Sequence, residues 1–168
     1  LIADHQGRMI VGQFGSYIGP FLEGFDGTVE DGDMIFLSDP YSVGGAISHC
    51  NDWLVLLPVF KDGRLIAYTS MFGHQSDIGG KVVGSMPIKA HSIFEEGVRI
   101  PPVKIWRKGE YNADLIKLVM HQTRKPDWCA ADLNALIASC RVAARRVIEM
   151  AERFGDDVYV SATQELLA

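Results

Sequence analysis

The sequence of 168 residues has little cysteine, no long hydrophobic run and no concentration of basic charge. Its three cysteines, Cys50, Cys129 and Cys140, lack the spacing of a disulfide framework, so we expect reduced thiols in a cytoplasmic protein. The longest apolar stretch, residues 53–60, is far shorter than the roughly 20 residues that cross a membrane. A formal net charge of -5 leaves no basic stripe, which argues against nucleic acid or an anionic membrane as a partner.

The remaining composition is that of a globular protein. Hydrophobic residues make up 48% and charged residues 22%, which is enough apolar material to bury a core. We expect one domain over residues 1–168, or a fragment of a larger subunit, because the chain opens at Leu1 within a strand-like segment. Residues 1–111 read mainly as strands and loops, and residues 112–168 mainly as helices. The prediction is therefore an α+β fold, with a β-rich N-terminal part followed by two to three helices.

The first part of the chain shows several strand patterns. We expect strands at residues 1–3, 9–11, 34–37, 53–60 and 64–72. The clearest hairpin joins the last two strands through Asp62-Gly63, a dipeptide typical of a type I′ turn. Residues 79–102 are rich in glycine and proline and predict a long functional loop. The segment 12–31 fits neither pattern.

The helical part is divided by its capping and breaking residues. Asn112 is expected to cap a helix over residues 113–123, which Pro126 then ends. A second helix is expected to open at Asp127 or Asp132 and to run to residue 154, before a glycine. A final short helix is expected near residue 161.

Two copies of a His-x-x-Asp motif lie at the ends of the clearest hairpin. His49 and Asp52 lead into its first strand, and His74 and Asp77 follow its second strand. With the turn at the Asp-Gly dipeptide, residues pair when their numbers sum to 125, which places Asn51 opposite His74. The Cα atoms of directly opposed residues on paired strands lie about 4.5–5.5 Å apart. The two imidazoles and two carboxylates are therefore predicted to meet at the open end of the hairpin.

This set of side chains suits a divalent metal ion. Imidazole favours Zn, Fe, Ni or Cu, and carboxylates extend the range to Mn, so Mn is favoured here with Zn or Fe as alternatives. Four protein ligands still leave positions for water or substrate on a six-coordinate ion. Two neighbours leave alternatives open: Cys50 as a further ligand, and Asp39 either as the partner of a ligand histidine or as a turn-forming residue.

The glycine- and proline-rich loop holds further candidates. His91 could line a pocket there, and Glu95-Glu96 read either as an acid/base pair or as a solvated loop. His5, in a turn, and His121, on a helix, fit surface positions better than a site.

Several segments carry a family resemblance: Ser38-Asp39-Pro40-Tyr41, His49-x-x-Asp52, His74-x-x-Asp77-Ile78-Gly79-Gly80, Gly84-Ser85-Met86-Pro87, and Ile93-Phe94-Glu95-Glu96-Gly97-x-x-Ile100-Pro101-Pro102-Val103-Lys104. In this order they resemble the hydantoinase B/5-oxoprolinase family, which includes the catalytic subunits of acetone and acetophenone carboxylases. The match extends to Asp132-Leu133-Asn134 in the helical part. Members are much longer, so the chain resembles an N-terminal part of one.

The resemblance implies an ATP-dependent enzyme made of different subunits. A hydantoinase A-like partner with an actin-like ATPase fold would activate a small-molecule substrate with ATP, and the B-type subunit would complete the reaction. In the acetone carboxylase branch the two motifs carry a metal, which implies a ligand role for His49, Asp52, His74 and Asp77. That branch has another histidine two residues before the first motif, where this chain has Ile47.

Because Ile47 stands where the acetone carboxylase branch has a histidine, the resemblance favours a subunit of an ATP-dependent hydantoinase or oxoprolinase that hydrolyses a cyclic amide bond. His91 or Glu95 would assist proton transfer. One alternative is a ketone carboxylase subunit that couples an activated enol to CO₂ or bicarbonate. Another is a non-catalytic scaffold subunit in which the metal only stabilises the end of the hairpin.

Overall fold

A computed structural model describes residues 1–13 and 17–167, so positions 14–16 and 168 of the expected domain lie outside the described residues. Its strands are β1 (Ile2–Asp4), β2 (Met9–Val11), β3 (Met34–Leu37), β4 (Asp52–Lys61), β5 (Arg64–His74), β6 (Val103–Arg107) and β7 (Glu110–Tyr111). They form one antiparallel sheet in the order β2-β1-β5-β4-β3-β6-β7. The helices are α1 (Ile18–Gly24), α2 (Ala113–His121), α3 (Pro126–Phe154) and α4 (Asp156–Leu166), with 3-10 turns η1 (Pro40–Val43) and η2 (Ile93–Glu95). The predicted α+β fold is confirmed.

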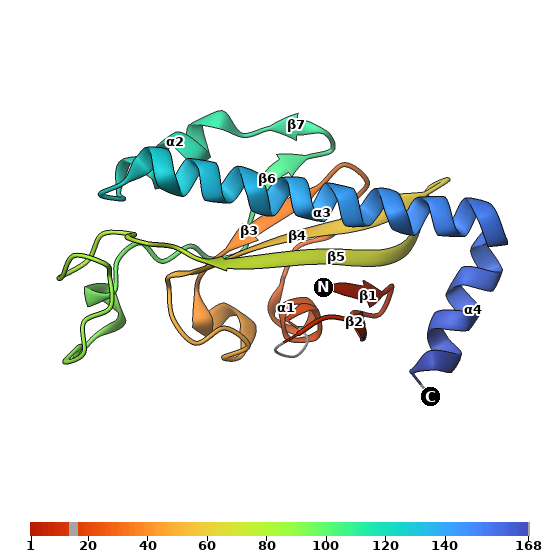
Figure 1. The fold of residues 1–168 in the computed structure, drawn as a ribbon, viewed down its shortest axis with the longest axis horizontal. Coiled ribbons are helices and arrows are strands. Elements are labelled where there is room, and N and C mark those ends of the chain that lie inside the picture. Colours follow the sequence, from red (N-terminus) through yellow and green to blue (C-terminus); the bar gives the residue numbers. More distant parts are fainter. Residues whose placement is uncertain (14–16, 168) are drawn as a thin grey trace.

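The long hairpin of β4 and β5 forms the centre of the sheet (Figure 1). Its turn has positive φ at both central residues, 50° at Asp62 and 79° at Gly63, which is the type I′ geometry expected from the sequence. The pairing departs from the predicted register beyond the first two pairs. Val59 pairs with Ala67, whereas the next residue of β4 pairs with Leu65, so Ile66 is an extra residue on β5. This β-bulge shifts the remaining pairs to numbers that sum to 126.

The helix α3, 29 residues long, crosses the face of the sheet over β4 and β5 (Figure 1). Its apolar stripe meets the inward side chains of the strands, among them Trp53 and Val55. Gly73 on β5 leaves room for this contact, because a Cβ there would lie 3.1 Å from a methyl group of Leu136. Two to three helices were predicted after residue 111, and the structure has three there, with Asn112 capping the first of them through the Leu115 amide at 3.1 Å.

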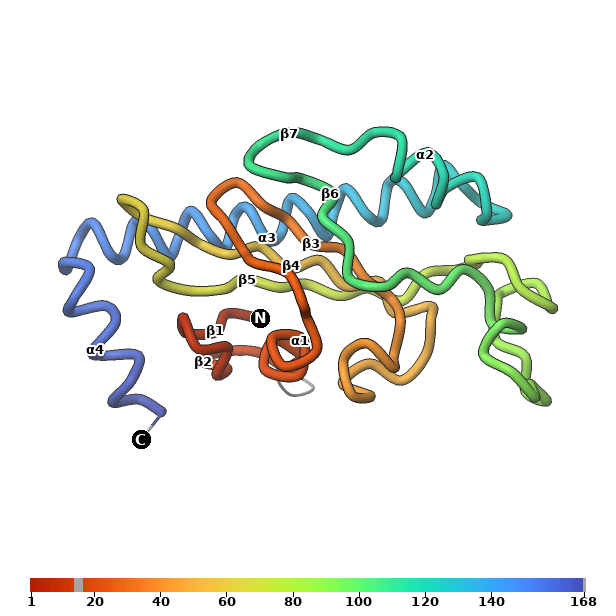
Figure 2. Tube along the Cα trace, turned by 180° about the vertical axis from the view of Figure 1, so that it is seen from behind, coloured from red at the N-terminus to blue at the C-terminus, as the bar shows by residue number. Residues whose placement is uncertain are grey.

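A second apolar layer covers the opposite face of the sheet. Ile18 and Phe21 of α1 pack there against Leu54 and Leu56 of β4. Figure 2, seen from behind, places α1 and the η1 turn on the side of the sheet away from α3. The helix α1 was not predicted, because its seven residues are too few to show a helical period around Pro20.

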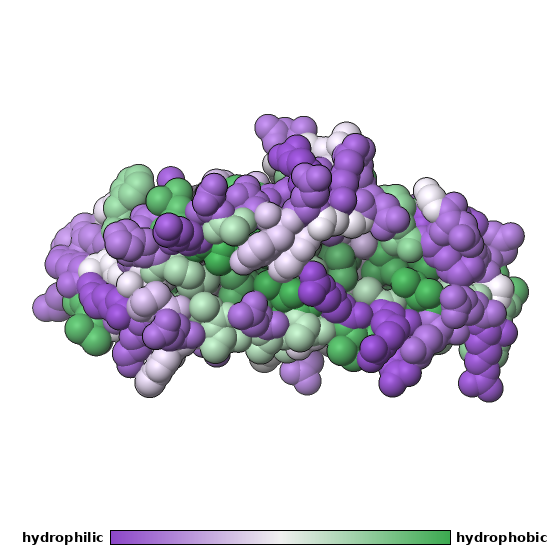
Figure 3. All heavy atoms as spheres, turned by 90° about the horizontal axis from the view of Figure 1, so that it is seen from above, coloured by the Kyte–Doolittle hydropathy of each residue, from purple (hydrophilic) through white to green (hydrophobic). Residues whose placement is uncertain are grey.

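The outer surface over the helices remains mixed in polarity. Figure 3 looks down on the helical side, where hydrophobic residues gather along the middle of the view and hydrophilic residues lie around them. Exposed apolar side chains on α2 and α3 include Leu118, Trp128, Val142 and Met150. Among the described residues, no helix combines the length and the hydrophobicity needed to cross a bilayer.

Candidate metal centre

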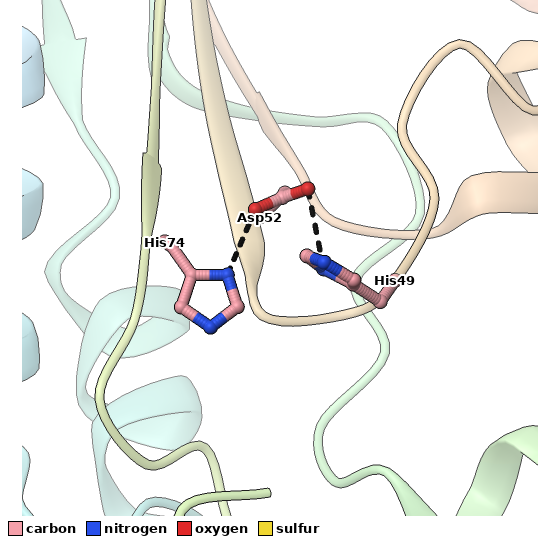
Figure 4. A group of neighbouring side chains, drawn as sticks. All are labelled: His49, Asp52 and His74. Carbon is pink, nitrogen blue, oxygen red and sulfur yellow. Dashed lines mark hydrogen bonds and ion pairs between the residues drawn. The ribbon is translucent and has the colours of Figure 1, made fainter. Parts of the chain in front are cut away.

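Three of the four predicted metal ligands meet at the open end of the β4–β5 hairpin (Figure 4). Asp52 is the first residue of β4 and pairs directly with His74, the last residue of β5. His49 lies in the turn just before β4, and its carbonyl oxygen accepts the amide of Asp52 at 3.2 Å. The register produced by the bulge matters here, because paired residues share one face of a sheet. Asp52 and His74 consequently point to the α1 side.

The Asp52 carboxylate lies between the two imidazoles. Its Oδ1 is 3.1 Å from His74 Nδ1, its Oδ2 is 3.2 Å from His49 Nδ1, and the two rings meet edge to face with centroids 4.9 Å apart. Asp52 is only 9% exposed, whereas the side chain of His74 is 48% exposed. One potential ligand atom from each residue lies within 4.8 Å of the others. The group is thus compact and open to solvent on the His74 side.

The donor set fits a divalent ion. His49 Nδ1 is buried and has no hydrogen-bond partner, since the nearby Asp52 oxygen is poorly aligned with it. A buried nitrogen without a partner is costly unless something else binds it. Adjacent ligands about 2.1 Å from one ion lie roughly 3.0–3.4 Å from each other. The two contacts of Asp52, at 3.1 and 3.2 Å, have this spacing.

A cavity of about 360 Å³ opens beside the three side chains. Tyr17, Ile47 and Phe72 contribute to its wall, with the rings of Tyr17 and Phe72 in an edge-to-face contact at 5.3 Å. Burial raises the pKa of Tyr17, and the charge of Asp52 raises it further. Tyr17 was not predicted as a site residue, because it belongs to the segment of residues 12–31, which fitted no secondary-structure pattern.

Asp77, the fourth predicted ligand, is not brought into this group. Its carboxylate is 1% exposed and accepts hydrogen bonds from other parts of the chain: the amides of Gly79 and Gly84, the Ser85 hydroxyl and the Arg124 guanidinium. Burial alone would raise the pKa of Asp77, but these four hydrogen bonds outweigh it and hold the pKa below its ordinary value.

The two alternatives near the first motif also lie outside the group of three. Cys50 is fully buried, its amide donates to Glu96 Oε2 at 3.2 Å, and burial together with the charge of Glu96 raises the pKa of its thiol to about 12. Asp39 caps η1 through the Tyr41 amide at 3.1 Å and the Ser42 hydroxyl at 2.8 Å. Asp39 therefore acts as the turn-forming residue.

The two predicted proton-transfer residues lie in the long loop. The exposed His91 lines a second cavity, of about 460 Å³, which shares Ile47 and Ser48 with the cavity beside His49, Asp52 and His74. Glu95 is instead paired with Lys81 at 2.7 Å, and this hydrogen-bonded pair, followed by the His91 amide, lowers the pKa of Glu95. Its neighbour Glu96 is the acidic residue in the cavity wall.

Comparison with known proteins gives this centre a family context. The model of the family described as hydantoinase B/oxoprolinase matches residues 1–168. Caprolactamase subunit beta of Pseudomonas jessenii is 37% identical over 164 residues, which cover 96% of this chain and 28% of that subunit. The delta subunit of acetophenone carboxylase from Aromatoleum aromaticum is 32% identical over 147 residues, covering 89% of this chain and 21% of that subunit.

A solved structure agrees with these sequence matches. The crystal structure of the ATP-dependent caprolactamase from Pseudomonas jessenii superposes with a TM-score of 0.86 at 35% identity, covering 98% of this chain and 30% of that chain. The chain therefore spans less than a third of the length of each of these relatives. Sequence and structure together show that the chain belongs to the hydantoinase B/oxoprolinase family.

Proposed function

We propose that this chain supplies the metal centre of an ATP-dependent enzyme that hydrolyses a cyclic amide. The observation that carries the proposal is the group of His49, Asp52 and His74 at the end of a hairpin, in a chain 37% identical to a caprolactamase subunit. When bound, a divalent ion would supply a Lewis acid that polarises a carbonyl oxygen and makes water a better nucleophile near neutral pH. Mn is favoured, with Zn or Fe as alternatives, because the ligands are two imidazoles and one carboxylate.

The residues around the centre have separate roles in this proposal. Asp52, which lies between the two imidazoles, would bind the ion together with them and offset part of its charge. The half-exposed side of His74 leaves the approach to a substrate carbonyl open. His91, in the adjoining cavity, is the candidate for delivering a proton to the ring nitrogen as the C–N bond breaks. Glu95 contributes by holding the His91 backbone at 3.2 Å rather than by exchanging protons.

ATP would reach the reaction through a second polypeptide. Several relatives are named as subunits, and one solved relative is described as ATP-dependent. We propose a hetero-oligomer in which a hydantoinase A-like ATPase activates the amide of a small-molecule substrate, and hydrolysis to the ring-opened amino acid is completed at the metal centre.

The decisive experiment combines metal analysis with product analysis. The purified protein is expected to hold about one Mn, Zn or Fe per centre, and Asp52→Asn to hold almost none. With the partner ATPase, ATP and a lactam or hydantoin, the ring-opened product should form, and Asp52→Asn should slow it by more than roughly 100-fold, since even outer-shell changes cost 10–100-fold. Asp157→Asn, at a surface position 91% exposed, is the matched control. Undiminished metal in Asp52→Asn would overturn the proposal.

A carboxylase function is the second candidate, favoured by the acetophenone carboxylase delta subunit at 32% identity. Supplying the same preparation with ATP, a ketone and labelled bicarbonate separates the two enzymes, because only a carboxylase incorporates the label. A scaffold function is the third candidate. It would be supported if Asp52→Asn kept full activity and lost only thermal stability.

A further inference from the structure

The carboxylate of Asp77 is the centre of a dense hydrogen-bond network away from the proposed metal ligands. Its Oδ1 accepts from the amide of Gly79 at 2.9 Å, from the hydroxyl of Ser85 at 3.1 Å and from Nη1 of Arg124 at 2.9 Å. Its Oδ2 accepts from the amide of Gly84 at 2.9 Å. Both oxygens of this buried group are thus occupied by donors, and a metal ion would have to displace them.

Arg124 extends the network from the link between α2 and α3. Its Nη1 also donates to the carbonyl oxygens of Gly79 and Val82, each at 2.9 Å, and its Nη2 donates to the carbonyl of Gly80. The loop approaches the link so closely that a Cβ on Gly79 would lie 2.8 Å from the carbonyl oxygen of Gln122. One guanidinium therefore binds the short segment of residues 77–82 to the link between α2 and α3.

The tethered segment in turn holds the far end of the same loop. The amide of Lys81 donates to the carbonyl of Glu95 at 2.8 Å, and the amide of Val98 donates to the carbonyl of Ile78 at 3.0 Å. A Cβ on Gly80 would meet the Glu95 carbonyl oxygen at 2.4 Å, so the two segments are in close contact. Residues 78–81 and 95–98 consequently form one hydrogen-bonded unit.

This unit ends at the cavity next to the metal centre. Glu95 Oε1 accepts the amide of His91 at 3.2 Å, and Glu96 Oε2 accepts the amide of Cys50, the residue after His49, also at 3.2 Å. His91 and Glu96 both line the second cavity, which adjoins the cavity of the metal centre through shared wall residues. A continuous set of hydrogen bonds thus leads from Asp77 to the wall beside the proposed metal ligands.

We propose that Asp77 and Arg124 form a clasp that positions the loop of residues 78–98, and with it the His91 and Glu96 wall, so that Asp77 is a positioning residue and not a fourth metal ligand. This inference rests on the proposed function, because the loop is positioned relative to the proposed metal centre. A carboxylate that receives four donors stabilises one loop conformation strongly, because hydrogen bonds to a charged acceptor are about twice as strong as neutral ones. The clasp therefore acts on substrate placement and leaves metal binding intact.

The test compares two Asp→Asn substitutions in the purified protein. Metal content and amide hydrogen exchange are measured for the wild type, Asp52→Asn, Asp77→Asn and the surface control Asp157→Asn. Asp77→Asn is expected to keep the wild-type metal content while the amides of Lys81 and Val98 exchange roughly 10- to 100-fold faster. The exchange rates of the amides in β4, β5 and α3 should be unchanged, whereas a general loss of stability would raise them too. If Asp77→Asn fails to fold, Arg124→Gln is measured in its place, because this side chain is 38% exposed and touches no proposed ligand.

A kinetic measurement with ATP, the partner ATPase and a cyclic amide separates positioning from stability. The clasp predicts a raised KM for the amide together with a lower kcat per bound metal, because the displaced loop carries both the cavity wall and His91, the proposed proton donor. Loss of metal in Asp77→Asn, to the level of Asp52→Asn, would overturn the inference and leave the metal centre standing. Unchanged exchange at Lys81 and Val98 would overturn it as well. Retention of metal in Asp52→Asn would instead contradict the proposed function.

Discussion

Removal of the His74 imidazole should separate the stability of the fold from the stability contributed by a metal. In the metal-free protein, His74→Ala loses one hydrogen bond of 3.1 Å to Asp52 from a side chain that is 48% exposed. Such a bond at a half-exposed position contributes about 0.5–1 kcal/mol. For a domain of this size, that loss lowers Tm by about 1–4 °C. The metal-free variant should therefore remain folded.

Metal binding should stabilise the wild type much more than this. An ion present at 100 times its Kd stabilises the folded state by about 2.7 kcal/mol, which raises Tm by about 5–11 °C. If His74 is a ligand, its loss weakens binding at least 100-fold, so the same ion concentration contributes only about 0.4 kcal/mol to the variant. The wild type and His74→Ala should then differ mainly in their response to metal.

Differential scanning calorimetry checks this prediction in chelator and then in excess Mn²⁺ or Zn²⁺. His121→Ala is the matched control, because His121 is exposed near the end of α2 and outside the candidate centre. The control should show the full shift of the wild type. An equal metal-induced shift in His74→Ala would refute the assignment of His74 as a ligand.

Three further predictions follow from local geometry. Gly63→Val should destabilise the protein by about 1–2 kcal/mol in a urea titration, because φ is +79° there while a Cβ would meet no atom within 4 Å, so backbone strain alone is changed. Because the pKa of Asp77 is lowered on folding, the stability that its charge contributes should be complete above the ordinary carboxyl pKa of about 3.9 and lost as pH falls through the lowered pKa. Hydrogen exchange of residues 78–98 should therefore show no added opening between about pH 5 and 8. The opening that acid induces in these residues should be absent from Asp77→Asn. All three cysteines are buried, and burial is the main cause that raises the pKa of their thiols, to about 12 for Cys50 and Cys140. A thiol reagent at pH 8 should therefore label none of them before unfolding and all three afterwards.

The parts of the fold that depend on local signals were predictable. The Asp62-Gly63 turn, the strands on either side and the Asn112 cap each depend on a few adjacent residues whose conformational preferences are strong. The breaks between the last helices follow from Pro126 and Gly155 for the same reason. Such preferences are visible in one sequence because no distant contact is needed to produce them.

The parts that depend on distant contacts were not predictable. The helix α1 is held by the burial of Ile18 and Phe21 against strands that lie more than ten residues further along the chain. Tyr17 reaches the cavity beside the candidate metal centre through the same packing. The partners of Asp77 come from positions up to 47 residues away, the farthest being Arg124, so motif spacing alone could not show that Asp77 is hydrogen-bonded to Arg124.

The bulge at Ile66 explains why a prediction made in a register that is off by one residue still named three side chains that meet in the structure. Without the extra residue, His74 would pair with Asn51 and point to the α3 side of the sheet, away from Asp52. With it, Asp52 and His74 become directly paired and share the α1 side, where the turn before β4 also delivers His49. The motif spacing therefore predicted which residues come close along the hairpin, whereas the face that they share depends on one buried residue eight positions before His74. The candidate centre is thus a property of the bulged hairpin as well as of its ligands.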